Sequence, residues 1–242
     1  PDQIAAVILE PMNTVYPENE FLKEVRDITN FHNSILIFDE TITGGRYSIG
    51  GAQDLFDVTP DLATFGKGIA NGFPLSAIVG KRKIMRHMEN IFFSGTFSGE
   101  TSALAAAKVV LDKIQNTSLL IDLESKGKRL IQDVKMLINK HRVEHIFSIS
   151  GHPSWSFLHI KGVKSVNPMS IKTLMLQELF ARGIIFIGTH NLSAAHSEED
   201  LKQLILAYDI IFPMVREAVE SNTINDYLRV EPITPLFQVR NK

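Results

Sequence analysis

Hydrophobic residues along the first part of the chain fall into runs that predict a strand, a helix and a second strand. Residues 4–9 form a short apolar run that ends at Glu10-Pro11, where proline stops strand pairing. Residues 20–32 carry apolar side chains at helical spacing. Residues 35–38 are four consecutive apolar positions, typical of a parallel strand covered on both faces. This order predicts a βαβ unit with a right-handed crossover.

The same kind of pattern continues to about residue 141. Apolar runs at 60–65 and 75–79 predict two further strands on either side of a glycine-rich turn. An alanine-rich helix is expected to start at Ser98 or Glu100, and a long amphipathic helix to span about 118–141. The fold class is therefore α/β, with a mostly parallel sheet covered by helices.

Beyond that helix the pattern changes. We expect an antiparallel pair at 146–149 and 156–160, a helix at 170–181, a strand at 184–187, and a last helix that opens with Ser197 and runs to about 221. These elements indicate a small α+β domain. The predicted organisation is a large domain over 1–115, a linking helix over 116–142 and a small C-terminal domain over 143–242.

Composition narrows the class of protein. The chain has 242 residues, 44% hydrophobic and 21% charged, the usual values for a soluble globular protein. A net charge of −2 gives no reason to expect nucleic acid or an anionic membrane as a partner. The absence of cysteine excludes disulfides and thiolate metal sites and fits a cytoplasmic location. We expect no metal site, because His141 and His145 have no evident third ligand.

Lys67 and Asp39 form the most informative pair in the chain. Lys67 lies between Gly66 and Gly68, and glycines allow a lysine to approach a planar ligand closely. Asp39 follows the apolar run 35–38, and such strand ends deliver side chains to the crevice in which open α/β sheets bind ligands. A lysine amine can form a Schiff base and a carboxylate can hold a protonated ring nitrogen, which favours pyridoxal phosphate as cofactor.

Each of these features also has an ordinary structural interpretation. A glycine-flanked lysine is most often an exposed loop residue, and an aspartate after a strand is common in turns and helix caps. Hydroxyls and glycines at 93–99 suit a phosphate, but they can equally form an ordinary helix N-cap. Arg46 can bind a substrate carboxylate or simply be an exposed loop arginine. The glycines from Gly66 onward do not match a dinucleotide fingerprint, which argues against a nicotinamide dehydrogenase.

Three motifs in this order and spacing resemble one enzyme family: Ile37-Phe38-Asp39-Glu40, the segment 60–68 and the pair Gly95-Thr96. The stretch from Ile4 to about Leu130 resembles the class III (fold type I) pyridoxal phosphate aminotransferases. The resemblance is greatest to the glutamate-1-semialdehyde aminomutase branch, on the residues Gly44-Gly45-Arg46 and Gly50-Gly51-Ala52-Gln53 and, more weakly, on 192–200. It implies that the chain is part of the large domain of that fold followed by its small domain.

The resemblance also implies roles for individual residues. Lys67 forms the Schiff base and moves the proton between the substrate α-carbon and C4′ of the cofactor. Asp39 pairs with the pyridinium nitrogen. Thr41, where the family usually has valine, packs beside the ring. Gly95 and Thr96 bind the phosphate of the cofactor in the other subunit of a homodimer with shared active sites.

The expected function is therefore that of an aminotransferase or aminomutase, which moves an amino group between a small amino compound and an aldehyde or keto acceptor. Ile42 stands where many members have a glutamine near the cofactor. We also expect the chain to be a fragment, because it lacks an initiator methionine and starts directly before a strand. The alternative is accordingly a non-catalytic fragment or pseudoenzyme that serves as a dimerisation or interaction module.

Overall fold

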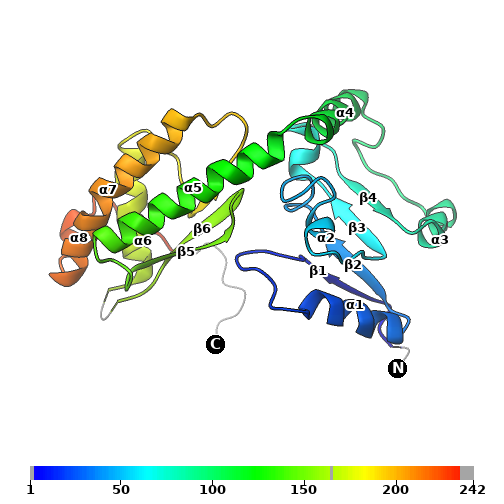
Figure 1. The fold of residues 1–242 in the computed structure, drawn as a ribbon, viewed down its shortest axis with the longest axis horizontal. Helices are drawn as coiled ribbons and strands as arrows, with labels where there is room; N and C mark the ends of the chain where they lie inside the picture. Colours follow the sequence, from blue (N-terminus) through cyan, green and yellow to red (C-terminus); the bar gives the residue numbers. More distant parts are fainter. Residues whose placement is uncertain (1–2, 164–165, 235–242) are drawn as a thin grey trace. The chain divides into compact units, whose positions relative to one another are not determined.

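A computed structural model gives the fold and describes residues 3–163 and 166–234. The chain divides into two compact units, Pro1–Glu124 and Ser125–Lys242, and the division falls within the long helix α5 (Leu119–Lys140) (Figure 1). This division lies inside the segment predicted as a linking helix. The three predicted domain ranges stay a prediction, and residues 164–165 and 235–242 of the predicted small domain lie outside the described residues.

The first unit is built on a four-stranded sheet in the order β1-β2-β3-β4. The strands are β1 (Ala6–Leu9), β2 (Ile35–Asp39), β3 (Leu62–Phe65) and β4 (Ala77–Gly80). β1, β2 and β3 are parallel, and β4 is antiparallel to β3. The mostly parallel sheet with helices that the sequence predicts is therefore confirmed.

Helix α1 (Phe21–Phe31) connects β1 to β2 and covers one face of the sheet. Leu36 and Phe38 of β2 are fully buried there, packed with Leu22 of α1 and with Val58. The opposite face of the sheet is more open than the apolar run at 35–38 predicts, because Ile35 and Ile37 are only partly buried and Ile8 of the neighbouring β1 is 63% exposed. The core of this unit therefore lies between α1 and the sheet.

Further helices of the first unit lie in the connections after β2, β3 and β4. They are α2 (Ala52–Leu55), η1 (Lys67–Ala70), α3 (Arg82–Met85), η2 (Arg86–Asn90) and α4 (Thr101–Asn116). Of the two expected starts of α4, the second is right: Glu100 is the N-cap, and its carboxylate accepts hydrogen bonds from the N–H groups of Ser102 and Ala103. The four short helices carry too few residues for a helical period and were not expected.

The second unit contains a three-stranded antiparallel sheet and helices packed against it. Its further elements are β5 (Phe147–His152), β6 (Trp155–Ile160), α6 (Pro168–Phe180), β7 (Thr189–Asn191), α7 (Glu198–Glu220) and α8 (Ile224–Tyr227). The sheet order is β5-β6-β7. The ring of Phe147 stacks on Phe212 of α7 at 4.7 Å, and Tyr208 stacks on the same ring at 5.1 Å. This aromatic cluster joins the sheet to α7.

The strand expected at 184–187 is wrong. That segment is irregular, Ile185 is 90% exposed, and the strand of this region is β7, which begins two residues later. Gly188, at φ 111°, redirects the backbone just before β7. The strand is fixed by His190, whose buried ring lies 2.9 Å from both Ser156 and Tyr208. A buried polar anchor, rather than the apolar run, therefore sets the position of this strand.

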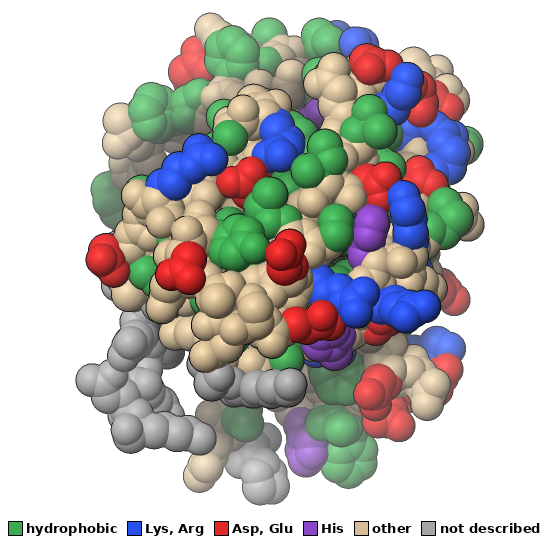
Figure 2. Space-filling view, turned by 90° about the vertical axis from the view of Figure 1, so that its left-hand side faces the viewer, with side chains coloured by type: hydrophobic (Ala, Val, Ile, Leu, Met, Phe, Trp, Pro, Cys, Tyr) green, Lys and Arg blue, Asp and Glu red, His purple; other side chains and the backbone are tan. Residues whose placement is uncertain are grey.

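The surface drawn in Figure 2 mixes acidic and basic side chains without a large patch of either sign, in keeping with the net charge of −2. Within the described ranges, the helices are either too short or too polar to cross a membrane.

Candidate active site

Asp39 lies at the carboxyl end of β2, beside the end of the parallel strand β3. The register pairs Asp39 with Thr64, so the two side chains are neighbours on adjacent strands. The hydroxyl of Thr64 and the backbone N–H of Thr41 each donate to Oδ1 of Asp39 at 3.0 Å. Both of these bonds end on Oδ1, and each carboxylate oxygen has two acceptor sites, so Oδ2 keeps the capacity to accept a hydrogen bond from a ligand.

The surroundings of Asp39 keep it ionised. Its pKa lies below the usual value, first because of a hydrogen bond from the Thr41 side chain. Hydrogen bonds from the Thr41 backbone and from Thr64, and the positive charge of Lys67, lower the pKa further. Burial opposes these effects but is outweighed. A carboxylate that stays charged well into the acid range is suited to hold a protonated ring nitrogen.

Lys67 follows β3 after one glycine and is the first residue of η1. Its backbone is left-handed, with φ 48°, a conformation that costs a non-glycine residue free energy and often marks a functional position. The side chain is exposed, and within the described residues no hydrogen bond or ion pair holds its amine. A Cβ placed on Gly68 would meet nothing within 4 Å, so there is open space beside the lysine.

Asp39, Thr41 and Lys67 therefore gather at one edge of the sheet. Lys67 is close enough to lower the pKa of Asp39, and the methyl group of Thr41 would lie 3.4 Å from a Cβ on Gly66. An exposed amine, an ionised carboxylate and adjacent open space fit a planar cofactor that carries an aldehyde and a ring nitrogen. Thr64, which holds Asp39, was missed from the sequence, because a polar residue inside an apolar strand becomes informative only once the strand register is known.

Gly95 and Thr96 are not joined to this cluster. They lie in the exposed segment 91–99 before α4, and no hydrogen bond among the described residues links them to Asp39 or Lys67. α4 itself packs against η1, the turn that carries Lys67. The predicted phosphate role of Gly95 and Thr96 in a second subunit stays a prediction.

Arg46 is not the exposed loop arginine that its glycine neighbours suggest. The side chain is half-buried, and burial lowers its pKa from the ordinary value, although Tyr47 opposes this effect. Its role in binding a substrate carboxylate stays a prediction.

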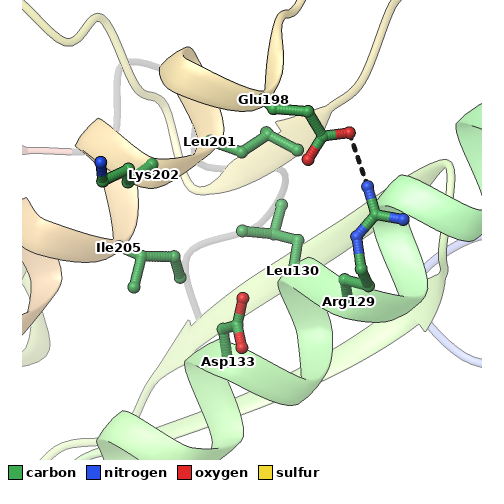
Figure 3. Close-up of a pocket in the computed structure, with 7 residues that line it drawn as sticks. All are labelled: Arg129, Leu130, Asp133, Glu198, Leu201, Lys202 and Ile205. Atoms are coloured by element: carbon green, nitrogen blue, oxygen red, sulfur yellow. Dashed lines mark hydrogen bonds and ion pairs between the residues drawn. The ribbon is translucent and has the colours of Figure 1, made fainter.

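A cavity of about 190 Å³ lies in the second unit, between α5 and α7 (Figure 3). Arg129 of α5 and Glu198 of α7 form an ion pair across it at 2.6 Å. Asp133 and Lys202 also line it. Paired charges from two helices are ordinary surface packing, and no group of three possible metal ligands occurs among the described residues. Nothing in its lining therefore favours this cavity over the cluster around Lys67 as the candidate site.

Comparison with known proteins identifies the family of the chain. The family model for aminotransferase class-III matches residues 1–196. Glutamate-1-semialdehyde 2,1-aminomutase of Caldicellulosiruptor bescii is 34% identical over 221 residues, which cover 84% of this chain and 52% of that protein. The FumI protein of Sphingopyxis sp. MTA144, solved in its PLP internal aldimine form, is 25% identical with a TM-score of 0.81, over 90% of this chain and 53% of that one.

An omega-transaminase from Sphaerobacter thermophilus shares the fold, with a TM-score of 0.78 at 24% identity, over 89% of this chain and 53% of that one. The chain thus spans about half the length of the curated relatives that it matches. The family match covers most of the chain and includes Asp39, Lys67 and the segment 91–99. The chain belongs to the class III aminotransferase family.

Proposed function

We propose that the protein containing this chain is a pyridoxal phosphate enzyme that moves an amino group between a small amino compound and an aldehyde or keto acceptor. The observation that carries the proposal is the placement of Lys67, two residues after β3, near Asp39 at the end of the adjacent strand β2. One is an exposed amine held in a strained backbone conformation, and the other is a carboxylate with a depressed pKa. A lysine amine for the Schiff base and a carboxylate for the ring nitrogen are the two groups that this cofactor requires.

In this proposal each side chain acts at a stated atom. Oδ2 of Asp39 accepts the N–H of the cofactor ring, while Thr64 and Thr41 hold Oδ1 and so fix the carboxylate. When bound, pyridoxal phosphate supplies an electron sink for the bonds at the substrate α-carbon. The Nζ of Lys67 would hold the cofactor covalently, and after the substrate's amino group has replaced it there, the freed amine would take up and return the proton at the α-carbon as general base and acid.

The proposal covers both kinds of amino transfer that the names of the relatives contain. The curated relative from Caldicellulosiruptor bescii is named as an aminomutase and the Sphaerobacter thermophilus structure as a transaminase. Both names describe an amino group that moves to or from a carbonyl carbon. Because the fold and the cofactor do not fix the acceptor, the donor and acceptor are left open.

We also propose a homodimer with shared active sites, in which Gly95 and Thr96 reach the cofactor phosphate across the interface. The support is the run of exposed aromatic side chains around this pair: Phe92 is 96% exposed, and Phe93 and Phe97 are exposed as well. Contiguous apolar patches of this kind usually mark a protein contact. A cytoplasmic location is part of the same proposal and is supported by the cysteine-free sequence.

The experiment is reduction of the cofactor-loaded protein with borohydride, followed by peptide mapping. We expect the mass of the reduced cofactor on the peptide that contains Lys67, and on no other lysine peptide. A protein that takes up no cofactor, or that carries it on another lysine, would overturn the proposal. The first of these results would favour a non-catalytic interaction module that retains the fold.

A further inference from the structure

Glu40 is a buried carboxylate directly after the proposed cofactor residue Asp39. Glu40 is 1% exposed. The backbone N–H groups of Ala52 and Gln53 donate to its two oxygens, one to each, at 2.8 Å. The hydroxyl of Thr43 also donates to Oε2. A buried charge is retained only where such donors satisfy it, so these contacts are necessary to the fold of this region.

All of these donors belong to one segment, residues 43–53, and all of them are neutral. The segment leaves the end of β2, passes through the glycine-rich turn and returns to the start of α2. Gly51, at φ 82°, lies so close to the carboxylate that a Cβ there would be 2.6 Å from Oε2. The side chain of Glu40 therefore fastens both ends of this loop to the end of β2.

The loop in turn touches the segment that leads to Lys67. A Cβ on Gly44 would collide with the ring of Phe65, which ends β3 two residues before the lysine. The N–H of Gly44 donates to the carbonyl of Glu40 at 2.8 Å, and the N–H of Glu40 donates to the carbonyl of Thr64 at 3.0 Å. The loop held by Glu40 therefore contacts the ends of β2, which carries Asp39, and of β3, which leads to Lys67.

We propose that Glu40 is a positioning residue for the cofactor site. Neighbouring residues of a strand point to opposite faces, so Asp39 faces the cofactor space while Glu40 faces the loop. The carboxylate of Glu40 binds the loop 43–53 to the end of β2. The loop, held in this position, keeps Asp39 and Lys67 at a fixed separation. This inference rests on the proposed function. It adds a residue that touches neither substrate nor cofactor but sets how tightly the cofactor is held.

The test compares variants of the protein that contains this chain. Glu40→Gln keeps the shape but turns one acceptor into a donor that faces a backbone N–H. Thr43→Val removes only the hydroxyl contact and serves as the milder variant if Glu40→Gln does not fold. The matched control is Glu24→Gln, an exposed glutamate of α1 in the same unit. For each protein we measure three quantities. They are the dissociation constant of pyridoxal phosphate, the pH midpoint at which the visible absorbance of the bound cofactor has changed by half, and the rate of trypsin cleavage after Arg46 in the absence of cofactor.

For Glu40→Gln we expect about tenfold or greater weakening of cofactor binding, the effect of losing one hydrogen bond to a charged group. We also expect the pH midpoint to shift by about 0.5 unit or more, since the charges around the ring are no longer fixed. Cleavage after Arg46 should be about tenfold faster. Thr43→Val should show the same changes at smaller size, and Glu24→Gln none.

The outcomes separate this inference from the function on which it rests. If the unmodified protein binds no pyridoxal phosphate, the proposed function is wrong and this inference is wrong with it. If the unmodified protein binds the cofactor and the Glu40 and Thr43 variants bind it with the same affinity and pH midpoint, only the positioning role is wrong. Faster cleavage after Arg46 without a change in those two values would likewise reduce Glu40 to a structural role and overturn the proposal.

Discussion

Replacing Asp39 by asparagine removes a charge from the proposed site while disturbing its surroundings little. The amide oxygen of asparagine can still accept from the Thr64 hydroxyl and the Thr41 N–H, which both end on Oδ1. The group that changes is the second oxygen, which becomes an NH₂ donor facing the ring N–H of the cofactor. A hydrogen bond that involves a charged partner contributes about 1.5–3 kcal/mol, so the variant should bind pyridoxal phosphate about 10- to 150-fold more weakly.

The assay is titration of the cofactor-free protein with pyridoxal phosphate, followed by visible absorbance, at several pH values. Because the folded-state pKa of Asp39 is depressed, the carboxylate and its contribution to binding are present at neutral pH and are lost only as pH falls through that lowered value. The variant should lack this acid-side loss. Asp27→Asn, an exposed aspartate of α1, is the control. Equal affinity for Asp39→Asn and the unmodified protein would refute the pairing of Asp39 with the ring nitrogen.

Three further changes test the fold and the proposed dimer. Asp61→Asn should lower the free energy of unfolding by about 3–5 kcal/mol at pH 7, because Asp61 is the buried partner of Arg26 at 2.9 Å and of Lys81 at 2.6 Å. Burial alone would raise the pKa of Asp61, but Lys81, a backbone N–H and Arg26 outweigh burial and lower it. The stability that Asp61 contributes should therefore be complete above about pH 4 and disappear as the pH falls through its folded-state pKa. A difference in urea unfolding between the two proteins that stays constant down to about pH 2 would contradict this. Asn167→Ala removes the N-cap of α6, whose Oδ1 accepts from a backbone N–H at 2.9 Å, and should cost about 1 kcal/mol in the same assay, with no change arguing against the cap. Phe92→Ser should raise the dimer dissociation constant at least about tenfold in sedimentation experiments if this side chain is buried between subunits, and an unchanged constant would remove Phe92 from the interface.

The sequence predicted those parts of the fold in which a single local pattern decides the outcome. β2 and α1 were predicted nearly to the residue, because a continuous apolar run and a helical period leave few alternatives. Ser197, which was expected to open the last helix, is the N-cap of α7 and forms a capping box in which Ser197 and Asp200 bond to each other's backbone. The strand at 184–187 failed for the opposite reason. Its position depends on the buried ring of His190 and its partners 18 and 34 residues away, which no local pattern contains.

For the proposed site, the sequence singled out the two groups to which we assign chemistry but not the groups that hold them in place. Lys67 and Asp39 stand out because their neighbours are unusual for a charged residue. Thr64 and Glu40 do not, because their importance comes from the strand register and from a loop that folds back over twelve residues. Glycines at 44 and 51 were noted for their resemblance to one family branch, and the structure adds the physical reason: a side chain at either position would collide with Phe65 or Glu40.

The most direct measurement is the visible absorbance of the protein that contains this chain, with pyridoxal phosphate added, before and after the change Lys67→Ala. Lys83→Ala, an exposed lysine of α3, is the matched control. The unmodified protein and the control should show a bound-cofactor band that borohydride bleaches and fixes to the chain, and Lys67→Ala should show neither the band nor the fixed cofactor. A band that persists unchanged in Lys67→Ala would contradict the assignment of this lysine as the cofactor-binding residue.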